Sequence, residues 1–175
     1  MPAPALWAPW RIEYIESIKP PGCFLCLGAA QAPSVETLVL GRGSRTVVLL
    51  NRYPYASGHI LIAPRAHLGD LAQLPDEVVV ESARMVKLAV GVLGQAMSPH
   101  GFNVGINLGE AAGAGVPDHL HWHIVPRWTA DTNFMPMLAD TRVVPEHLEA
   151  TWRRLHGAFA EGAARAELSW EAEDR

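Results

Sequence analysis

Hydrophobic and polar residues alternate along the middle of the chain in patterns that predict several strands. Thr46–Leu50 and His59–Ala63 are short apolar runs, and the turn residues at 53–58 between them predict a hairpin. Phe102–Leu108 predicts another strand. The segment His119–Val125 alternates polar and apolar residues up to its third histidine, which is typical of a strand with one buried face. These segments predict a sheet of short strands.

Two longer segments have the helical period of three to four residues. The first begins at Pro75, continues to about Met97 and is ended by Pro99 and Gly101. The apolar positions on one of its sides predict a buried stripe of Val79, Ala83, Val86, Val90 and Leu93. The second begins near Pro145, and its apolar stripe consists of Leu148, Trp152, Leu155 and Phe159.

This order of elements predicts an α+β fold, in which an antiparallel sheet is combined with one long central helix and a C-terminal helix. With 175 residues, of which 49% are hydrophobic, we expect a single domain over residues 1–175. Residues 1–22 are rich in Trp and Pro, and we expect them to form an N-terminal arm that packs on the body or on a partner. The acidic residues 167–175 are expected to be a frayed tail.

The charge balance excludes some classes of partner. Fourteen basic and eighteen acidic residues give a formal net charge of -4, and no block of basic residues is present. We therefore expect no binding to a nucleic acid polymer or to an anionic membrane surface. No apolar run reaches the roughly 18 residues that a membrane span needs. The N-terminus lacks the pattern of an export signal, so we expect a cytoplasmic protein.

Three of the eight histidines stand at alternate positions, at His119, His121 and His123. On a strand all three would project from one face, with neighbouring side chains about 6–7 Å apart. This arrangement fits a metal site, or a nucleophilic imidazole flanked by imidazoles that orient it. The remaining interpretation is a hydrated sheet face without chemistry.

The loop Gly109–Gly115 consists almost entirely of Gly and Ala, so we expect it to be irregular. Small residues let a ligand approach the backbone closely, and backbone N–H groups can hold an anion without any positive side chain. A small phosphate-bearing ligand is therefore compatible with a negatively charged protein. Hairpin loops also use glycine for purely conformational reasons, so the loop alone does not decide the function.

The segment His119–Val125 matches, at every position, the motif of the histidine triad (HIT) family, in which three alternate histidines are separated and followed by apolar residues. Asn51–His67 resembles the first hairpin of that family. Leu6–Arg11 and Asp131–Pro136 resemble a prokaryotic branch associated with diadenosine tetraphosphate phosphorylase activity. The resemblance covers roughly residues 23–127 and implies a HIT-like fold. It also implies a homodimer with sheets joined across the interface, which the helix starting at Pro75 would contact.

The resemblance implies a nucleotidyl transferase or hydrolase that acts on adenine nucleotides, above all on dinucleoside polyphosphates. In this family the middle histidine, here His121, attacks phosphorus and forms a covalent nucleotidyl-imidazole. His123 would then bind a phosphate oxygen or the leaving group. By the same resemblance, Asn51 would contact the ribose hydroxyls and Asn107 the phosphate region.

The sequence departs from the family pattern just before the triad. Hydrolase-type relatives carry Gly-Gln-Ser or Gly-Gln-Thr there, whereas Gly115 and Val116 stand in place of the two polar residues. Phosphate contacts are then expected from loop amides at Gly113 and Gly115, and the space left favours inorganic phosphate as a co-substrate. Two alternatives stay open. One is a hydrolase of nucleoside phosphoramidates or adenylate conjugates that uses His121, and the other is a non-catalytic, zinc-stabilised nucleotide-binding module.

The two cysteines, Cys23 and Cys26, are separated by two residues. This spacing fits a redox dithiol, a pair of reduced core cysteines, or half of a zinc site that needs two further ligands. The resemblance implies that His67 and His119 complete a structural zinc site. The sequence assigns no chemistry to the remaining histidines, which are His59, His100, His147 and His156.

Overall fold

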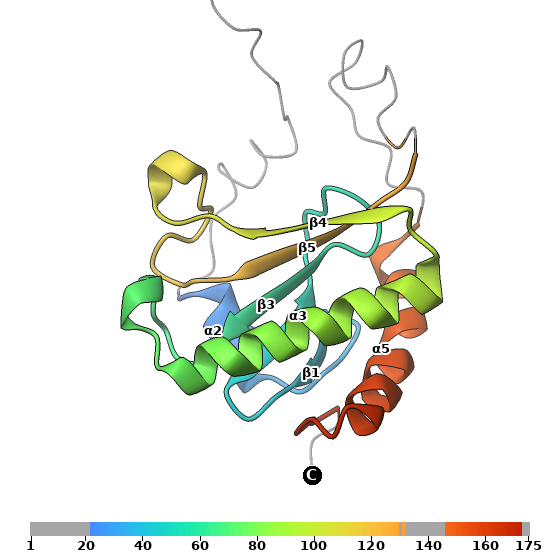
Figure 1. Ribbon diagram of the computed structural model, residues 1–175, viewed down its shortest axis with the longest axis horizontal. Coiled ribbons are helices and arrows are strands. Elements are labelled where there is room, and N and C mark those ends of the chain that lie inside the picture. The colour runs from blue at the N-terminus through green and yellow to red at the C-terminus, as the bar shows by residue number, and fades with distance from the viewer. Residues whose placement is uncertain (1–21, 130, 132–145, 173–175) are drawn as a thin grey trace, which may run out of the picture.

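The computed structural model describes residues 22–129, 131 and 146–172, which are drawn as a coloured ribbon in Figure 1. Residues 1–21 of the predicted arm, which include Leu6–Arg11, and the segment 132–136 lie outside these residues. The helices are α2 (Phe24–Ala30), α3 (Asp76–Met97) and α5 (Leu148–Arg165), and the strands are β1 (Val39–Arg42), β2 (Thr46–Leu50), β3 (Ile60–Pro64), β4 (Gly101–Ile106) and β5 (Trp122–Arg127). Short 3-10 turns lie at Leu71–Gln73 and Glu110–Ala112.

The five strands form one antiparallel sheet in the order β1-β2-β3-β5-β4. The predicted hairpin is confirmed, since Thr46 pairs with Pro64 and Leu50 with Ile60. β4 forms one edge of the sheet and runs beside β5, with Gly105 opposite His123. The α+β fold with an antiparallel sheet, a long central helix and a C-terminal helix is therefore the one predicted.

The last strand begins later than the sequence pattern predicts. β5 starts at Trp122, so His119 and His121 precede the strand instead of lying on it. The backbone N–H of Leu120 donates to the carbonyl of Leu68, outside the ladder of the sheet. The ring of His119 contacts that of His67 at a centroid distance of 5.1 Å, whereas His121 and His123 contact each other at 4.8 Å.

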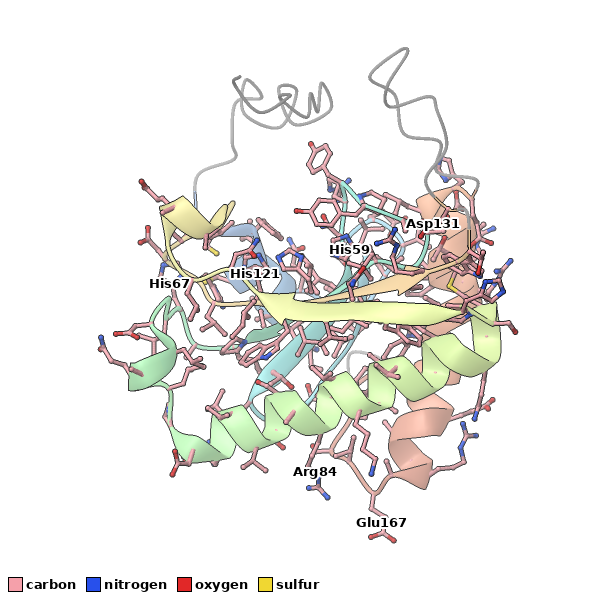
Figure 2. All side chains as sticks on the ribbon, turned by 45° about the horizontal axis from the view of Figure 1, so that its top comes forward. His59, His67, Arg84, His121, Asp131 and Glu167 are labelled. Carbon is pink, nitrogen blue, oxygen red and sulfur yellow. The ribbon has the colours of Figure 1, made fainter. Side chains whose placement is uncertain are left out.

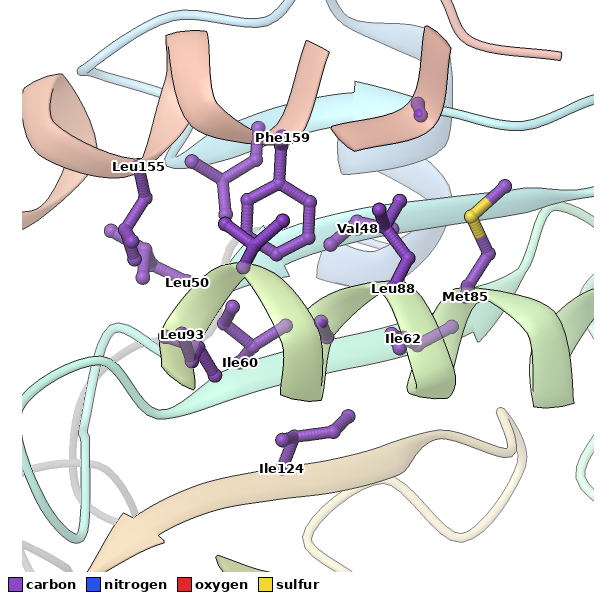
Figure 3. Packing of buried hydrophobic residues seen from close by; sticks show 14 of the residues in the cluster. Val48, Leu50, Ile60, Ile62, Met85, Leu88, Leu93, Ile124, Leu155 and Phe159 are labelled. Carbon is purple, nitrogen blue, oxygen red and sulfur yellow. The ribbon is translucent and has the colours of Figure 1, made fainter. Parts of the chain in front are cut away.

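The helices α3 and α5 cover one face of the sheet and enclose the main core (Figures 1 and 3). Leu155 and Phe159 are fully buried, as the predicted stripe of the last helix requires. The predicted stripe of α3 is rotated by about one position, and Ala83 is exposed. The buried residues of α3 are instead Val78, Ser82, Met85, Leu88, Ala89, Val92 and Leu93. α3 packs against both the sheet and α5, so a wider face of this helix is buried than the predicted stripe.

The opposite face of the sheet is covered over β1–β3 by α2, which the sequence pattern did not predict. Leu25 and Ala29 of α2 pack on Val47, Leu49 and other buried residues of that face. Over β4 and β5 no helix of the described part of the chain covers this face. Figure 2 shows His59, His67 and His121 on this side of the sheet, and Arg84 on the side of α3.

The C-terminal segment is packed as far as the structure describes it, which differs from the expected frayed tail. The ring of Trp170 stacks on Phe159 at 5.8 Å, and a Cβ added to Gly41 would overlap its indole. The backbones of Arg42 and Glu171 exchange two hydrogen bonds of 3.0 and 2.8 Å. Trp170 therefore adds apolar area to the core, and residues 173–175 lie outside the description. Among the described helices, none has the length and hydropathy to cross a membrane.

Candidate active site and adjoining metal cluster

Four predicted metal ligands lie together at one end of the uncovered face. Cys23 is the N-cap residue just before α2 and Cys26 lies on the first turn of that helix, while His67 follows β3 and His119 precedes β5. One ligand atom from each residue lies within 4.8 Å of the other three. The Nδ1 atom of His119 is 3.2 Å from the Cys23 sulfur, 3.4 Å from the Cys26 sulfur and 3.3 Å from Nδ1 of His67.

These distances fit a tetrahedral zinc ion. Zinc bonds of about 2.0–2.3 Å place the ligand atoms roughly 3.3–3.8 Å apart. The other ring nitrogen of His119, Nε2, donates to the carbonyl of Pro64 at 2.8 Å, which leaves the lone pair of Nδ1 for a metal. Burial, and then the nearby His67 and His121, lower the pKa of His119 and so favour the neutral form that binds metal. The donor set is therefore suited to zinc.

The thiol of Cys26 supports the same interpretation. Burial raises its pKa, and the neighbouring Cys23 raises it further. Two thiolates at this separation repel each other, and a bound cation would offset that repulsion. The cluster thus has the ligand types and the spacing of a metal site, and a cation would reduce the repulsion between its two thiolates.

His121 lies next to the cluster and is almost fully buried, with 7% of its surface exposed. Its Nδ1 is 2.9 Å from the backbone carbonyl of His119. A carbonyl can only accept, so Nδ1 carries the hydrogen and Nε2 keeps the lone pair. Burial lowers the pKa of His121, although the hydrogen bond to His119 opposes this effect. The ring is therefore a neutral imidazole with a fixed tautomer.

His123 is held by a second histidine, His59, whose side chain is 1% exposed. The backbone N–H of Tyr55 donates to Nδ1 of His59 at 3.1 Å, so the hydrogen of that ring is on Nε2. This Nε2–H donates to Nδ1 of His123 at 3.0 Å, and the hydrogen of His123 is consequently on its own Nε2. Burial, and then His121, lower the pKa of His123 to about 4.

The two triad rings thus have opposite roles. Their centroids are 4.8 Å apart, and the bonds described above give Nε2 of His121 a lone pair and Nε2 of His123 a hydrogen. A nucleophile and a hydrogen-bond donor therefore stand side by side on the uncovered face. This pair suits the transfer of a group that carries negative oxygen, such as a phosphate ester.

The sequence interpretation missed His59, which it treated as an ordinary strand residue. His59 precedes β3, and the register of β3 with β5 places Leu61 opposite His123. A histidine at the start of an otherwise apolar, buried strand needs a hydrogen-bond partner, and this was the available signal.

Two of the predicted substrate contacts, Asn51 and Asn107, make hydrogen bonds within the protein. Oδ1 of Asn51 accepts from the N–H of Tyr53 at 3.0 Å, and its Nδ2 is 3.3 Å from Nδ1 of His59. Asn107 follows β4, and its Nδ2 donates to the carbonyl of Gly113 at 3.5 Å. Gly113 has a φ of 83°, a value that favours glycine. The loop that holds Gly113 and Gly115 includes a 3-10 turn, whereas an irregular loop was expected.

Two relatives of this chain have the names of enzymes that act on nucleotides. AP-4-A phosphorylase from Mycobacterium tuberculosis is 36% identical over 165 residues, which are 89% of this chain and 84% of that protein. Adenosine 5'-monophosphoramidase from Schizosaccharomyces pombe is 31% identical over 106 residues, which are 60% of this chain and 74% of that protein.

A solved structure extends the comparison to the metal. A Zn-bound histidine triad family protein from Mycobacterium smegmatis superposes with a TM-score of 0.64 at 27% identity, covering 81% of this chain and 95% of its own. The HIT domain pattern itself matches residues 32–130. This match includes the hairpin, α3 and all three triad histidines, and the chain therefore belongs to the HIT domain family.

Proposed function

We propose that the protein cleaves dinucleoside polyphosphates such as diadenosine tetraphosphate, through a nucleotidyl group bound covalently to His121. The observation that carries the proposal is the 2.9 Å hydrogen bond from Nδ1 of His121 to the His119 carbonyl, because it leaves Nε2 unprotonated and aimed away from the backbone. The 36% identity to the M. tuberculosis AP-4-A phosphorylase supports this choice of substrate.

The first half-reaction forms one bond and breaks one. The lone pair of His121 Nε2 attacks the α-phosphorus, and the bond from phosphorus to the bridging oxygen breaks. The oxygen departs with the electron pair as part of the leaving nucleotide, ATP in the case of diadenosine tetraphosphate. His123 donates its Nε2–H to that oxygen or to a phosphate oxygen and so stabilises the developing charge.

The second half-reaction releases the nucleotide. An oxygen of inorganic phosphate attacks the same phosphorus, the P–N bond breaks, and His121 recovers its lone pair. The product is ADP, whereas attack by water would give AMP. We infer phosphorolysis because Gly115 and Val116 leave room before the triad and because the M. tuberculosis relative is a phosphorylase. The amides at Gly113 and Gly115, with Asn107, are proposed to hold the phosphates, and Asn51 the ribose.

We also propose that Cys23, Cys26, His67 and His119 hold a structural zinc ion. When bound, the ion supplies a cross-link between α2, the end of β3 and the segment before β5. His119 is both a proposed ligand and the residue whose carbonyl orients His121. The metal site would therefore keep the nucleophile in position without taking part in the chemistry.

The second candidate is a hydrolase of adenylate conjugates. The 31% identity to the S. pombe monophosphoramidase favours it, since the identity extends over 60% of this chain. The same His121 would attack, and an amine would leave with the proton of His123.

The edge of the sheet supports a proposed homodimer. β4 is an edge strand, and an edge strand presents unpaired backbone groups to a partner. Val104 on β4 and Leu108 just after it are 47% and 48% exposed. Two copies paired along β4 would bury these apolar side chains.

Cys23 and Cys26 are free thiols, which agrees with a reducing compartment. We therefore propose that the protein is located in the cytoplasm.

The test incubates the purified protein with diadenosine tetraphosphate, with and without inorganic phosphate. ADP and ATP formed only with phosphate are the expected products. A rapid-quench sample should contain a protein heavier by one adenylyl group, and this adduct should be absent from His121→Asn. The matched control, His100→Asn, changes a histidine at the other end of the sheet and should keep the adduct. Products without any adduct would contradict the covalent step.

A further inference from the structure

Gly105 on β4 lies directly opposite His123 on β5, and the two strands run side by side in Figure 1. Residues that face each other across an antiparallel pair have their Cβ atoms about 4.5–5.5 Å apart on the same face of the sheet. A side chain at position 105 would therefore stand beside the ring of His123 on the uncovered face. Glycine leaves this space open.

The fold itself does not require a glycine at this position. Gly105 lies within β4, and its φ is outside the left-handed region. Among the described residues, no heavy atom except those of its two chain neighbours lies within 4 Å of a Cβ built on Gly105. A glycine inside a strand lowers stability, and it often marks a position that a ligand or another backbone approaches closely. The open space is therefore available to a ligand or to a partner chain.

The hydrogen of His123 is directed towards this space. Nδ1 of His123 accepts from His59, which precedes β3, and β3 and β4 flank β5 on opposite sides. Nε2 lies across the ring from Nδ1, so its hydrogen points away from His59 and towards β4. Alternate residues of a strand share a face, which places Asn107, just past the end of β4, next to Gly105 in the same row. An imidazole N–H and an amide thus border the space, and both suit an oxygen-rich anion.

Room for an anion is needed here only if phosphate is the acceptor. The acceptor oxygen approaches phosphorus roughly in line with the breaking bond, on the side opposite to Nε2 of His121. A water molecule fills little space in that position, whereas phosphate has three further oxygens. The ring centroids of His121 and His123 are 4.8 Å apart, so these oxygens would come close to the N–H of His123.

We propose that the space above Gly105 holds the inorganic phosphate that attacks the nucleotidyl group on His121, and that Gly105 selects phosphate over water. This inference rests on the proposed function and deepens it. An oxygen of phosphate forms the new bond to phosphorus while the P–N bond breaks and its electron pair returns to His121. The N–H of His123 meanwhile donates to another oxygen of the same phosphate. A larger side chain at position 105 would therefore hinder phosphate far more than water.

The experiment measures how the covalent intermediate is divided between the two acceptors. With diadenosine tetraphosphate as substrate, attack by phosphate gives ADP and attack by water gives AMP. The slope of the ADP:AMP ratio against phosphate concentration therefore reports on the second half-reaction alone. Gly105→Val should lower this slope at least about tenfold, as expected when a hydrogen bond to a charged group is lost. Gly105→Ala adds one methyl group and should lower the slope less.

The matched control is Gly101→Val, on the same face and at the start of the same strand. Gly101 is opposite Arg127, and a Cβ built on it also meets no described atom within 4 Å apart from its chain neighbours. Valine is favoured in strands, so both variants should fold, which thermal unfolding checks. Because β4 is also the proposed dimer edge, Val104→Asp on the other face of this edge shows what a weakened dimer alone does to the slope. Size-exclusion chromatography gives the oligomeric state of each variant.

A slope for Gly105→Val within twofold of that for Gly101→Val would overturn the proposal. An equal fall in Val104→Asp would also overturn it, because a partner chain and not phosphate would then account for the open space. Wild-type protein that forms the adenylyl adduct but releases only AMP would overturn the phosphate site and leave the covalent step intact. The absence of the adduct from wild-type protein would instead contradict the proposed function, since the adduct forms before phosphate attacks.

Discussion

Two groups of histidines lie side by side on the same face of the sheet, and their ring nitrogens are arranged in different ways. In the metal cluster, Nδ1 of His67 and Nδ1 of His119 converge with two sulfur atoms within 4.8 Å. In the catalytic pair the Nδ1 atom of each ring instead has its own partner, which is Nε2 of His59 for His123 and a backbone carbonyl for His121. Several ligand atoms that point to one place suit a bound cation, whereas a single hydrogen-bond partner for each Nδ1 fixes the tautomer of each histidine.

This difference shows that spacing in the sequence does not distinguish the two uses of histidine. His119 and His121 are two residues apart and both buried. They differ in the group that each Nδ1 contacts. Nδ1 of His119 lies beside the sulfur atoms of Cys23 and Cys26, whereas Nδ1 of His121 donates to a backbone carbonyl. Substitutions in one group should therefore have effects that the other group does not share.

The largest difference between the effect on activity and the effect on zinc binding is expected for His121→Ala. Loss of the proposed nucleophile should lower kcat for diadenosine tetraphosphate by roughly 10⁴-fold or more. Zinc content and the melting temperature should stay near the wild-type values, because Nδ1 of His121 contacts a carbonyl and no proposed ligand atom. The measurements are steady-state kinetics and elemental analysis on the same preparation. Activity within tenfold of wild type would remove His121 from the mechanism.

The reverse pattern is expected for the metal cluster. His67→Ala removes one of four proposed ligands, so zinc should fall well below one equivalent per chain. Loss of a structural metal should cost roughly 4 kcal/mol of the free energy of unfolding and lower Tm by about 10 °C. His100→Ala is the control, since His100 bonds to Thr129 at the far end of the sheet. Wild-type protein without zinc at near-stoichiometric levels would contradict the metal assignment.

The sequence was sufficient for those parts of the molecule in which a local pattern determines the structure. The β2–β3 hairpin follows from two apolar runs around a turn, and the long helix follows from its period. The four proposed ligands were also named from the sequence, by resemblance rather than by any property of their spacing. Cys23 and His119 are 96 residues apart, and only the fold brings them to 3.2 Å.

Features that depend on tertiary contacts could not be predicted. α2 is seven residues long and lacks a side-chain cap, so its packing on β2 and not its own propensity stabilises it. The alternation of the triad predicted a strand from His119, but the backbone there bonds to Leu68 instead. His59 acquires its role only from the register that brings it to His123. In each case the missing information is a partner distant in sequence.

A smaller effect on activity is expected at His59, which supports His123 without reaching the substrate. His59→Leu should lower kcat by roughly 100-fold, since the hydrogen of His123 is then free to move to Nδ1. KM should change little, because His59 is 1% exposed. His59→Gln places an amide N–H near the former Nε2 and should recover part of kcat. Equal losses in both variants, with a matching fall in Tm, would indicate a purely structural role.

The smallest effect is expected in the dependence of stability on pH, and it comes from the catalytic group. Burial and His121 hold the pKa of His123 at about 4, against about 6.5 for a histidine in the unfolded chain. Among the residues that the structure describes, the rings that contact His123 are those of His59, His121 and Tyr55, and none of these groups is a carboxylate. Between these two pKa values the unfolded state binds the proton and the folded state does not. Stability should therefore be complete above about pH 6.5 and fall as the pH drops towards 4.

His123→Gln removes this titration, so urea unfolding between about pH 7 and pH 5 should show a shallower slope than the wild-type protein. The difference should be at most about 1 kcal/mol per pH unit, because part of the ring is accessible to solvent. The variant His147→Gln, at the exposed start of α5, serves as the control and should keep the wild-type slope. Parallel slopes for wild type and His123→Gln would mean that His123 titrates alike in the folded and unfolded chain, and that its neutral form is not maintained by burial.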